Sequence, residues 1–140
     1  MTKWFQALLF SSIFATSALA FAQTNELSKP LTASLSVSGQ MSSEKFIQLM
    51  QQGYRSVIVN RPDEEQGNLV SVNQLREIGA PKGVAVIYQP VVSGRITPKD
   101  VEDFAKYYNQ LAKPILMVCR SGSRSTQLFN QAKALGLIDE

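Results

Sequence analysis

Cys119 lies in a segment whose residue types and spacing suit nucleophilic chemistry. Residues 115–125 read ILMVCRSGSRS: an apolar run, one cysteine, and a small polar stretch with a glycine and two arginines. The apolar run is typical of a buried strand, and residues that follow such a strand lie at the carboxyl edge of the sheet, where ligands bind in open α/β folds. We therefore expect Cys119 to act as a thiolate nucleophile that forms a covalent intermediate.

The residues after Cys119 could bind an anion. The small side chains and glycine at 121–123 let successive backbone N–H groups point inward as an anion-binding nest, and a helix that begins near Arg124 would aim its positive end at the same point. The guanidinium of Arg124 can hold a tetrahedral oxyanion or a sulfur-bearing group. Arg120 either binds substrate anions or is a solvated loop residue. The alternative for the whole segment is an inert buried thiol followed by a polar helix cap. The predicted substrate-binding residues are Arg120, Ser121, Gly122, Ser123 and Ser125.

The composition limits the chemistry that can surround this cysteine. The 140 residues contain no His and a single Cys, which excludes a Cys–His pair, an intrachain disulfide and most metal sites. We expect no metal and no cofactor. The net charge of +3 is scattered without a Lys/Arg cluster, so the sequence does not indicate nucleic-acid binding, but it suits a small anionic substrate.

The first 22 residues have the pattern of a signal peptide. Lys3 precedes a mostly apolar stretch over 4–19, and small residues follow up to Ala22, after which we expect cleavage. The alternative is a membrane anchor, but an apolar stretch of this length, broken by Ser and Thr, is short for a membrane span. We therefore expect an exported protein, periplasmic if the host is Gram-negative, with no stable membrane anchor after cleavage. It would comprise a flexible leader over 23–33 and one catalytic domain over 34–140.

Strands and helices are expected to alternate along that domain. The later strands are continuous apolar runs without polar alternation, which indicates a parallel sheet covered on both faces. The sequence thus predicts an α/β fold with three layers (α/β/α) and a mainly parallel sheet of four to five strands. The expected strands cover 34–37, 56–59, 84–88 and 115–118, and the expected helices cover about 43–52, 70–78, 97–111 and 125–135.

Two family resemblances rest on these residues. The loop CRSGSRS resembles the active-site loop of rhodanese-type sulfurtransferases, in which four residues separate Cys from Arg. Residues 33–136 are similar to the phosphatase-like domain of beta-lactamase hydrolase-like proteins, a relative of dual-specificity and tyrosine phosphatases. The stretches that carry this second resemblance are VSGQ at 37–40, SVIVNRPD at 56–63, PVVSGRITP at 90–98 and the Cys119 loop.

The chain departs from the cysteine phosphatases at two points. Those enzymes have five residues between Cys and Arg, and they carry an acid shortly after a Pro-Val pair, where this chain has Val92 and Ser93. Asp63 is the nearest substitute for that catalytic acid, although a solvated turn residue after Pro62, beside Glu64 and Glu65, is the favoured interpretation of it. Arg61 and Arg95 are expected on loops that flank the site, as surface charges rather than substrate ligands.

Sulfur transfer avoids both departures because it needs no proton for a leaving oxygen. The expected function is therefore a rhodanese-type sulfurtransferase or persulfide-handling protein, in which Cys119 takes a sulfane sulfur and an acceptor thiol or anion removes it. The first alternative is a phosphatase-like hydrolase that forms a cysteinyl-phosphate, with Asp63 as the acid. The second alternative is a non-catalytic module that binds an anion or a partner.

Overall fold

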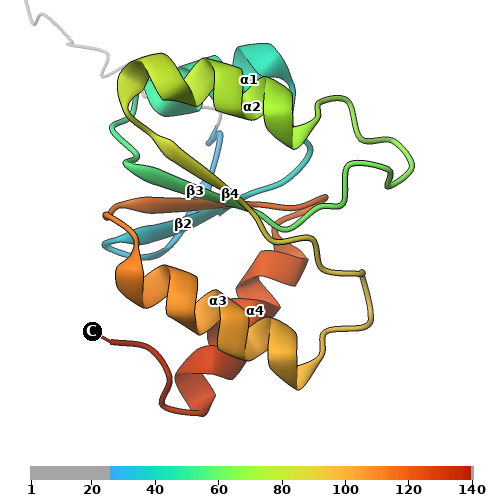
Figure 1. The fold of residues 1–140 in the computed structure, drawn as a ribbon, viewed down its shortest axis with the longest axis vertical. Helices are drawn as coiled ribbons and strands as arrows, with labels where there is room; N and C mark the ends of the chain where they lie inside the picture. Colours follow the sequence, from blue (N-terminus) through green and yellow to red (C-terminus); the bar gives the residue numbers. More distant parts are fainter. Residues whose placement is uncertain (1–25, 140) are drawn as a thin grey trace, which may run out of the picture.

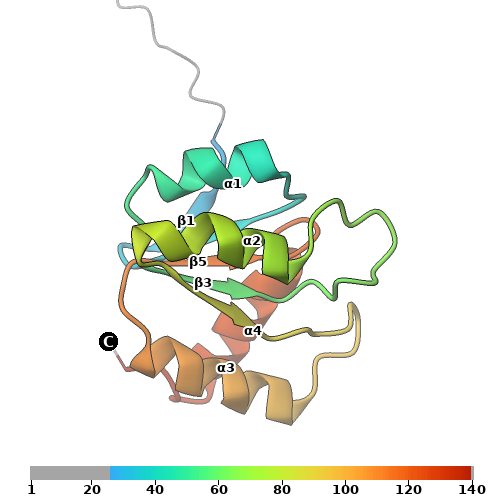
Figure 2. The ribbon, with the colours of Figure 1, turned by 45° about the horizontal axis from the view of Figure 1, so that its top comes forward.

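A five-stranded sheet is covered by helices on both faces (Figure 1). The computed structural model describes residues 26–139. Helices α1 and α2 lie on one face of the sheet and α3 and α4 on the other, and the turned view agrees (Figure 2). The elements in chain order are β1 (Lys29–Thr32), β2 (Leu35–Ser38), α1 (Ser43–Met50), β3 (Ser56–Val59), α2 (Val72–Gly79), a 3₁₀ turn η1 (Ala80–Lys82), β4 (Ala85–Tyr88), α3 (Pro98–Gln110), β5 (Ile115–Val118) and α4 (Ser123–Ala134).

The strand order is β1-β2-β5-β3-β4, so β5 is the central strand. β2, β5, β3 and β4 are mutually parallel, while β1 pairs antiparallel with β2. All four residues of β5 are buried, as expected of an apolar run covered on both faces. The prediction of a three-layer α/β fold with a mainly parallel sheet is confirmed.

The predicted flexible leader over 23–33 is wrong for residues 29–32, which form β1. Lys29 pairs with Val37 and Pro30 with Ser36, and Leu31 packs against the core. A proline is acceptable here because β1 is an edge strand, where a missing N–H costs no ladder bond. The predicted signal peptide over 1–22 lies outside the described residues. Within 26–139, no helix combines the length and apolarity needed to cross a membrane.

Side-chain caps fix where the helices begin. Thr97 accepts from the backbone N–H of Asp100, whose carboxylate accepts in return from the N–H of Thr97, so α3 starts where its sequence predicts. Ser71 and Gln74 form the same arrangement at the start of α2. The last helix, α4, begins at Ser123, two residues earlier than expected, because Gly122 takes the capping position itself.

The core has one cluster on each face of the sheet. Phe46 and Leu49 of α1 pack toward one face, and Phe104 and Tyr108 of α3 pack toward the other. Because four strands are parallel, their carboxyl ends meet at one edge of the sheet. The residues that directly follow these ends are Gly39, Asn60, Gln89 and Cys119.

Candidate active site

Cys119 follows the central strand and lines a small pocket. The residue is 1% exposed, its N–H donates to the carbonyl of Ser38 (3.1 Å), and its Sγ accepts from the backbone N–H of Gly122 (3.0 Å). The pocket has a volume of about 110 Å³, enough for a small tetrahedral anion. Its walls are formed by Ser93, Gly94, Cys119, Arg120, Ser121, Ser123, Arg124 and Gln127.

Gly122 shapes the turn that brings an amide to the sulfur. Its φ of +86° lies in the left-handed region that favours glycine, and it is the N-cap of α4. The turn therefore places the amide of Gly122 against Sγ and starts α4 immediately afterwards. The amides of the first helical turn have no acceptor within their own helix, so the positive end of α4 lies beside Cys119.

Gly39 allows the loop to lie directly against the end of β2. It forms an isolated bridge with Ser121, and a Cβ at this position would lie 3.0 Å from the carbonyl oxygen of Arg120. Such a contact with backbone atoms is too short for any larger residue without movement of the loop. Gly39 thus allows the Cys119 loop to pack closely against the end of β2, a role that the sequence did not reveal.

The predicted substrate-binding residues separate into two groups. Ser121 and Ser123 are exposed on the pocket wall, and Arg120 is exposed beside them. Ser125 does not line the pocket: it is fully buried, and its Oγ donates to Oδ1 of Asn60 (2.8 Å). Ser125 therefore ties α4 to the end of β3 rather than presenting a hydroxyl to a ligand.

Arg124 lines the pocket but spends most of its donors on the protein. Its Nη1 donates to the carbonyl of Val91 (2.8 Å) and, more weakly, to that of Asn60 (3.4 Å), and its Nη2 donates to Oε1 of Glu65 (3.0 Å). The side chain is 6% exposed, and its Nε is buried without a partner among the described residues. The predicted anion-binding guanidinium is thus held in place by Glu65 and two carbonyls, with Nε as its uncommitted donor.

Glu65 connects Arg124 to a second buried arginine. Its carboxylate lies 2.9 Å from Nη1 of Arg124 and 3.1 Å from Nε of Arg61. The hydrogen bond from Arg124 lowers the pKa of Glu65 below its ordinary value; partial burial opposes that shift, and the positive charges of Arg124 and Arg61 add to it. Arg61 is 3% exposed, so its expected role as a surface charge is wrong. Its Nη2 donates to the carbonyl of Gln66 (2.9 Å).

The structure does not bring Asp63 to the sulfur. Its Oδ1 accepts from the backbone N–H of Val72 (2.9 Å), and its own N–H donates to the hydroxyl of Tyr88 (2.9 Å). Asp63 therefore fixes the loop before α2, and it is absent from the walls of the Cys119 pocket. Asp63 lies on the loop between β3 and α2, and its carboxylate bonds to the N-terminus of α2.

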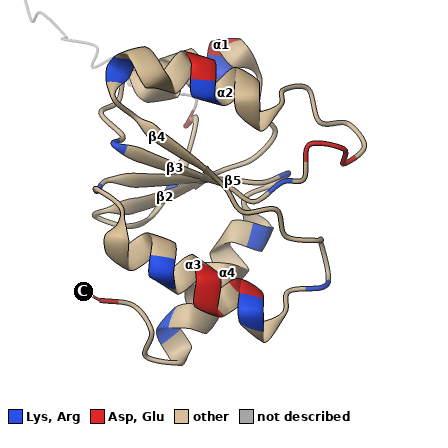
Figure 3. Cartoon of the chain, viewed as in Figure 1, with Lys and Arg blue, Asp and Glu red and all other residues tan. Residues whose placement is uncertain are grey.

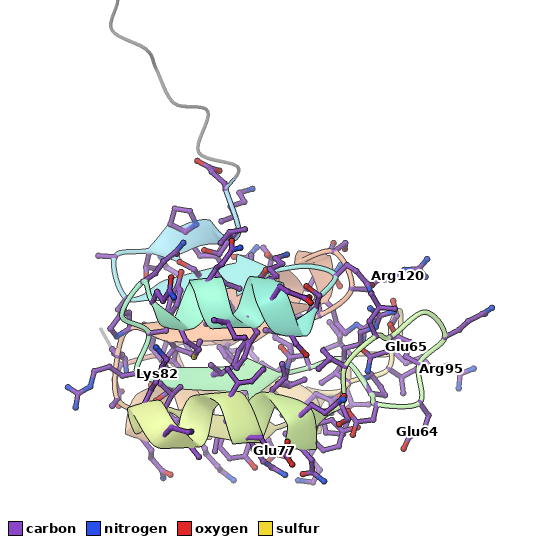
Figure 4. The ribbon with its side chains drawn as sticks, turned by 90° about the horizontal axis from the view of Figure 1, so that it is seen from above. Glu64, Glu65, Glu77, Lys82, Arg95 and Arg120 are labelled. Atoms are coloured by element: carbon purple, nitrogen blue, oxygen red, sulfur yellow. The ribbon has the colours of Figure 1, made fainter. Side chains whose placement is uncertain are left out.

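Lys, Arg, Asp and Glu residues are spread along the helices and loops of the described chain rather than confined to one element (Figure 3). Arg120 and Arg95 extend outward at the same end of the molecule as Glu65 (Figure 4). Both arginines are exposed, and Arg120 also lines the pocket. Their exposed guanidinium groups can attract an anion toward this end of the molecule, whereas the buried Arg61 and Arg124 pair with Glu65.

Two contributors to the site had weak sequence signals. Asn60 directly follows β3, the strand next to β5, and it is fully buried; its side chain joins Ser125 to the carbonyl of Gln89. Its position as a polar residue directly after a buried strand is the sequence feature that could have indicated Asn60. Glu65 had the i,i+4 spacing from Arg61, but nothing in the sequence indicated its pairing with Arg124.

Family comparison places most of the chain in one known class. A family model described as the phosphatase-like domain of beta-lactamase hydrolase-like proteins matches residues 28–136. The beta-lactamase hydrolase-like protein of Xylella fastidiosa (strain Temecula1) is 32% identical over 95 residues, which are 68% of this chain and 22% of that protein. The corresponding protein of Agrobacterium fabrum (strain C58) is 28% identical over 101 residues, 72% of this chain and 23% of that protein. The chain thus spans about a fifth of the length of these curated relatives.

Solved structures show the same architecture. A candidate phosphatase from Neisseria meningitidis Z2491 is 30% identical, with a TM-score of 0.70 over 77% of each chain. The core catalytic domain of the PP-IP phosphatase Siw14 from S. cerevisiae is 16% identical, with a TM-score of 0.56 over 78% of this chain and 75% of that one, and it shows the shared fold. The predicted tyrosine-phosphatase-like fold is confirmed. These comparisons favour the phosphatase alternative, and they do not support the expected rhodanese-type sulfurtransferase.

Proposed function

The chain belongs to the phosphatase-like domain family of beta-lactamase hydrolase-like proteins, and on that premise we propose that it hydrolyses phosphate monoesters through a phosphorylated Cys119. The observation that carries the proposal is the position of Sγ. It lines a pocket of anion size at the carboxyl end of the central strand, next to the amide of Gly122 and the N-terminus of α4. Backbone donors at such a point favour a thiolate and a bound phosphoryl group alike.

The reaction would run in two displacements at phosphorus. In the first, the thiolate of Cys119 forms an S–P bond while the bond from phosphorus to the ester oxygen breaks, and the alcohol leaves as an oxyanion. In the second, water forms a new O–P bond, the S–P bond breaks, and the thiolate is restored with release of inorganic phosphate. One proton of the water is finally taken up by the departed oxyanion, so the sum is hydrolysis of the ester.

The groups around the pocket would stabilise the transferring phosphoryl group. The first-turn amides of α4 are donors that need not move to meet developing negative charge, and the guanidinium of Arg124 adds a fixed positive charge on the pocket wall. Ser121 and Ser123 add hydroxyls on the wall, and Arg120 adds an exposed charge at the mouth. Loss of a single donor to a developing oxyanion typically costs an enzyme about 10²–10³ in rate.

The leaving group would depart without a proton from a side chain. No Asp or Glu is among the described residues that line the pocket, and Asp63 is bonded to Val72. Glu65 is held as a carboxylate between two arginines, because the bond from Arg124 lowers its pKa. Outside the described residues, 1–25 contain no Asp or Glu, and Glu140 is the last residue of the sequence. We therefore expect the rate to depend steeply on how well the leaving oxyanion is stabilised.

A series of aryl phosphates with leaving phenols of rising acidity tests this proposal. We expect hydrolysis that accelerates strongly along the series, is inhibited by vanadate, and is abolished by Cys119→Ser. Mass spectrometry of the quenched enzyme should show one added phosphoryl group, located on Cys119. Equal rates for the wild type and Cys119→Ser would refute the proposal. A parallel incubation with thiosulfate tests sulfur transfer: a stable persulfide on Cys119 together with no phosphatase activity would favour that reaction instead.

Export of the protein remains part of the proposal. It is supported by the lysine, apolar stretch and small residues within 1–22. The N-terminal sequence of the protein isolated from an expressing Gram-negative host tests it. A mature chain that begins at Gln23 in the periplasmic fraction is the expected result, and an intact Met1 in the cytoplasmic fraction would contradict it.

A further inference from the structure

A second and larger pocket adjoins the Cys119 pocket, and neither the family nor the proposed reaction assigns it a role. It has a volume of about 490 Å³, within the range of small-molecule sites. Ser121, Ser123 and Gln127 line both pockets, so the same turn of chain is a wall of each. The remaining walls come from residues 26–29, the end of β2 at Val37, Ser38 and Gly39, and Lys45, Gly122 and Thr126.

Lys45 is a partly buried cation on the wall of this second pocket. Its Nζ donates to the carbonyl of Gln40 (3.1 Å), and burial lowers the pKa of its ammonium group. The ion pairs of the described residues join Arg61 and Arg124 to Glu65 and Lys99 to Asp103, so Lys45 has no carboxylate partner there. An ammonium group that has lost part of its hydration without gaining a counter-ion is stabilised when an anion binds beside it.

The other polar groups on the walls suit the same ligand. Lys29 adds an exposed cation and Glu26 an exposed carboxylate, so with Lys45 the charged residues of the pocket sum to one positive charge. Five hydroxyl side chains also lie on the walls. Those of Ser38 and Thr126 donate to backbone carbonyls and that of Ser28 is bonded to Tyr54, so the exposed hydroxyls of Ser121 and Ser123 are the ones that can face a ligand. A phosphate group, with several acceptor oxygens, matches a surface of ammonium and hydroxyl donors better than an apolar group would.

We propose that this second pocket binds another phosphate group of the substrate, so that the protein acts on small molecules that carry two phosphate groups. One phosphoryl group would lie over Cys119 and be transferred, while the second would lie beside Lys45, with the Ser121–Ser123 turn between them. The inference rests on the proposed function, because it assigns the first phosphate to the Cys119 pocket. It goes beyond that function by naming the substrate class and the residue that selects it.

Calorimetric titration of Cys119→Ser, which cannot turn over, tests the subsite directly. The probes are propyl phosphate, the bisphosphates of propane-1,3-diol, butane-1,4-diol and hexane-1,6-diol, and inorganic phosphate. We expect at least one bisphosphate to bind about tenfold more tightly than propyl phosphate, the gain from one charge-assisted contact. Adding Lys45→Met should abolish most of that ratio, and Lys45→Arg should restore part of it.

Two further variants serve as controls. Lys82 lies on η1 at the opposite end of the molecule from Arg120 (Figure 4), and Lys82→Met should leave the ratio unchanged. If Lys45→Met does not fold, Lys29→Met provides a smaller reduction from an exposed side chain on the same wall. Circular dichroism of each variant establishes that it is folded before its affinities are compared.

The outcomes separate this inference from the proposed function. Equal binding of mono- and bisphosphates, or a Lys45→Met effect that is equal for both, would overturn the subsite even if aryl phosphates are hydrolysed. A Lys45 effect as large for inorganic phosphate as for the bisphosphates would also overturn it, because the pocket would then hold a free ion. A Lys45-dependent bisphosphate preference without any hydrolysis by the wild type would leave the subsite standing and refute the phosphatase.

Discussion

Replacing Glu65 with glutamine would remove the carboxylate that pairs with both Arg61 and Arg124. Glutamine keeps one oxygen acceptor at nearly the same place, but it loses the charge and presents an NH₂ donor to guanidinium donors. Two buried arginines, 3% and 6% exposed, would then lack their counter-ion. Because an unpaired buried charge destabilises the folded state, the substitution should lower the free energy of unfolding.

The structure sets the size of this effect. Breaking a fully buried ion pair costs about 3–5 kcal/mol, and one hydrogen bond to a charged group contributes about 1.5–3 kcal/mol. Glu65 is 20% exposed, so water compensates part of the loss. We expect Glu65→Gln to lower the free energy of unfolding by about 2–3 kcal/mol at neutral pH, a fall in Tm of about 10 °C for a domain of this size.

The pH dependence gives the effect a signature. The bond from Arg124 lowers the pKa of Glu65 below its ordinary value of 4.5. A carboxylate whose pKa is lower in the folded state contributes its full stabilisation above the ordinary pKa and loses it as the pH falls through the folded value. The gap in unfolding free energy between wild type and Glu65→Gln should therefore be constant from neutral pH down to about pH 5 and shrink below pH 4.5.

Urea denaturation of both proteins from pH 7 to pH 3 measures this gap. Glu64→Gln is the matched control, because Glu64 is the neighbouring exposed carboxylate, and it should change stability by less than about 0.5 kcal/mol. A gap of the same size for both variants at pH 7, or one for Glu65→Gln that does not narrow in acid, would refute the assignment of Glu65 as the ionised partner of the two arginines.

Three other substitutions test the geometry of the site. Gly39→Ala should lower the unfolding free energy by about 1–3 kcal/mol and reduce kcat/KM, because its Cβ would press on the carbonyl of Arg120. Thermal melts measure the first effect and aryl phosphate kinetics the second. An unchanged melting temperature would contradict the close contact. Gly122→Ala should lower the unfolding free energy by about 1–2 kcal/mol, because alanine is strained at this positive φ. It should also slow phosphoryl transfer by displacing the amide of residue 122 from Sγ, and kinetics equal to the wild type would argue against a role for that amide. Asp63→Asn should change kcat only a few-fold while lowering stability through its bond to Val72; a loss of about 10²–10⁴ in kcat would show instead that Asp63 is the catalytic acid.

Much of the fold could be predicted because local signals and burial agreed. The apolar run of β5 and the capping pair at Thr97 and Asp100 each indicate one structure with little competition. Segment 29–32 could not be assigned, because its pairing with β2 depends on backbone bonds that carry no side-chain pattern. The start of α4 was placed two residues late because Gly122 caps it through its backbone conformation rather than through a side chain.

The site was predictable in position but not in its internal bonding. The strand–cysteine–glycine–arginine order placed Cys119 at the sheet edge beside a helix N-terminus, as the structure shows. The partners of Arg124 depend on Glu65, which is 59 residues away in the sequence. Local pattern contains no information about such a distant contact. Asp63 shows the same limit. Its carboxylate, which the reaction would need as an acid, accepts a hydrogen bond from the backbone N–H of Val72, nine residues further along the chain.

The edge of the sheet at β1 has a consequence for self-association. Lys29 and Pro30 are both exposed there, on a strand of only four residues. A strand from another molecule that approached this border would meet a proline without an N–H to donate and an ammonium group that resists dehydration. Short, interrupted borders of this kind discourage sheets from polymerising into fibres. This side of the molecule is therefore protected against aggregation by the same residues that made it look unstructured.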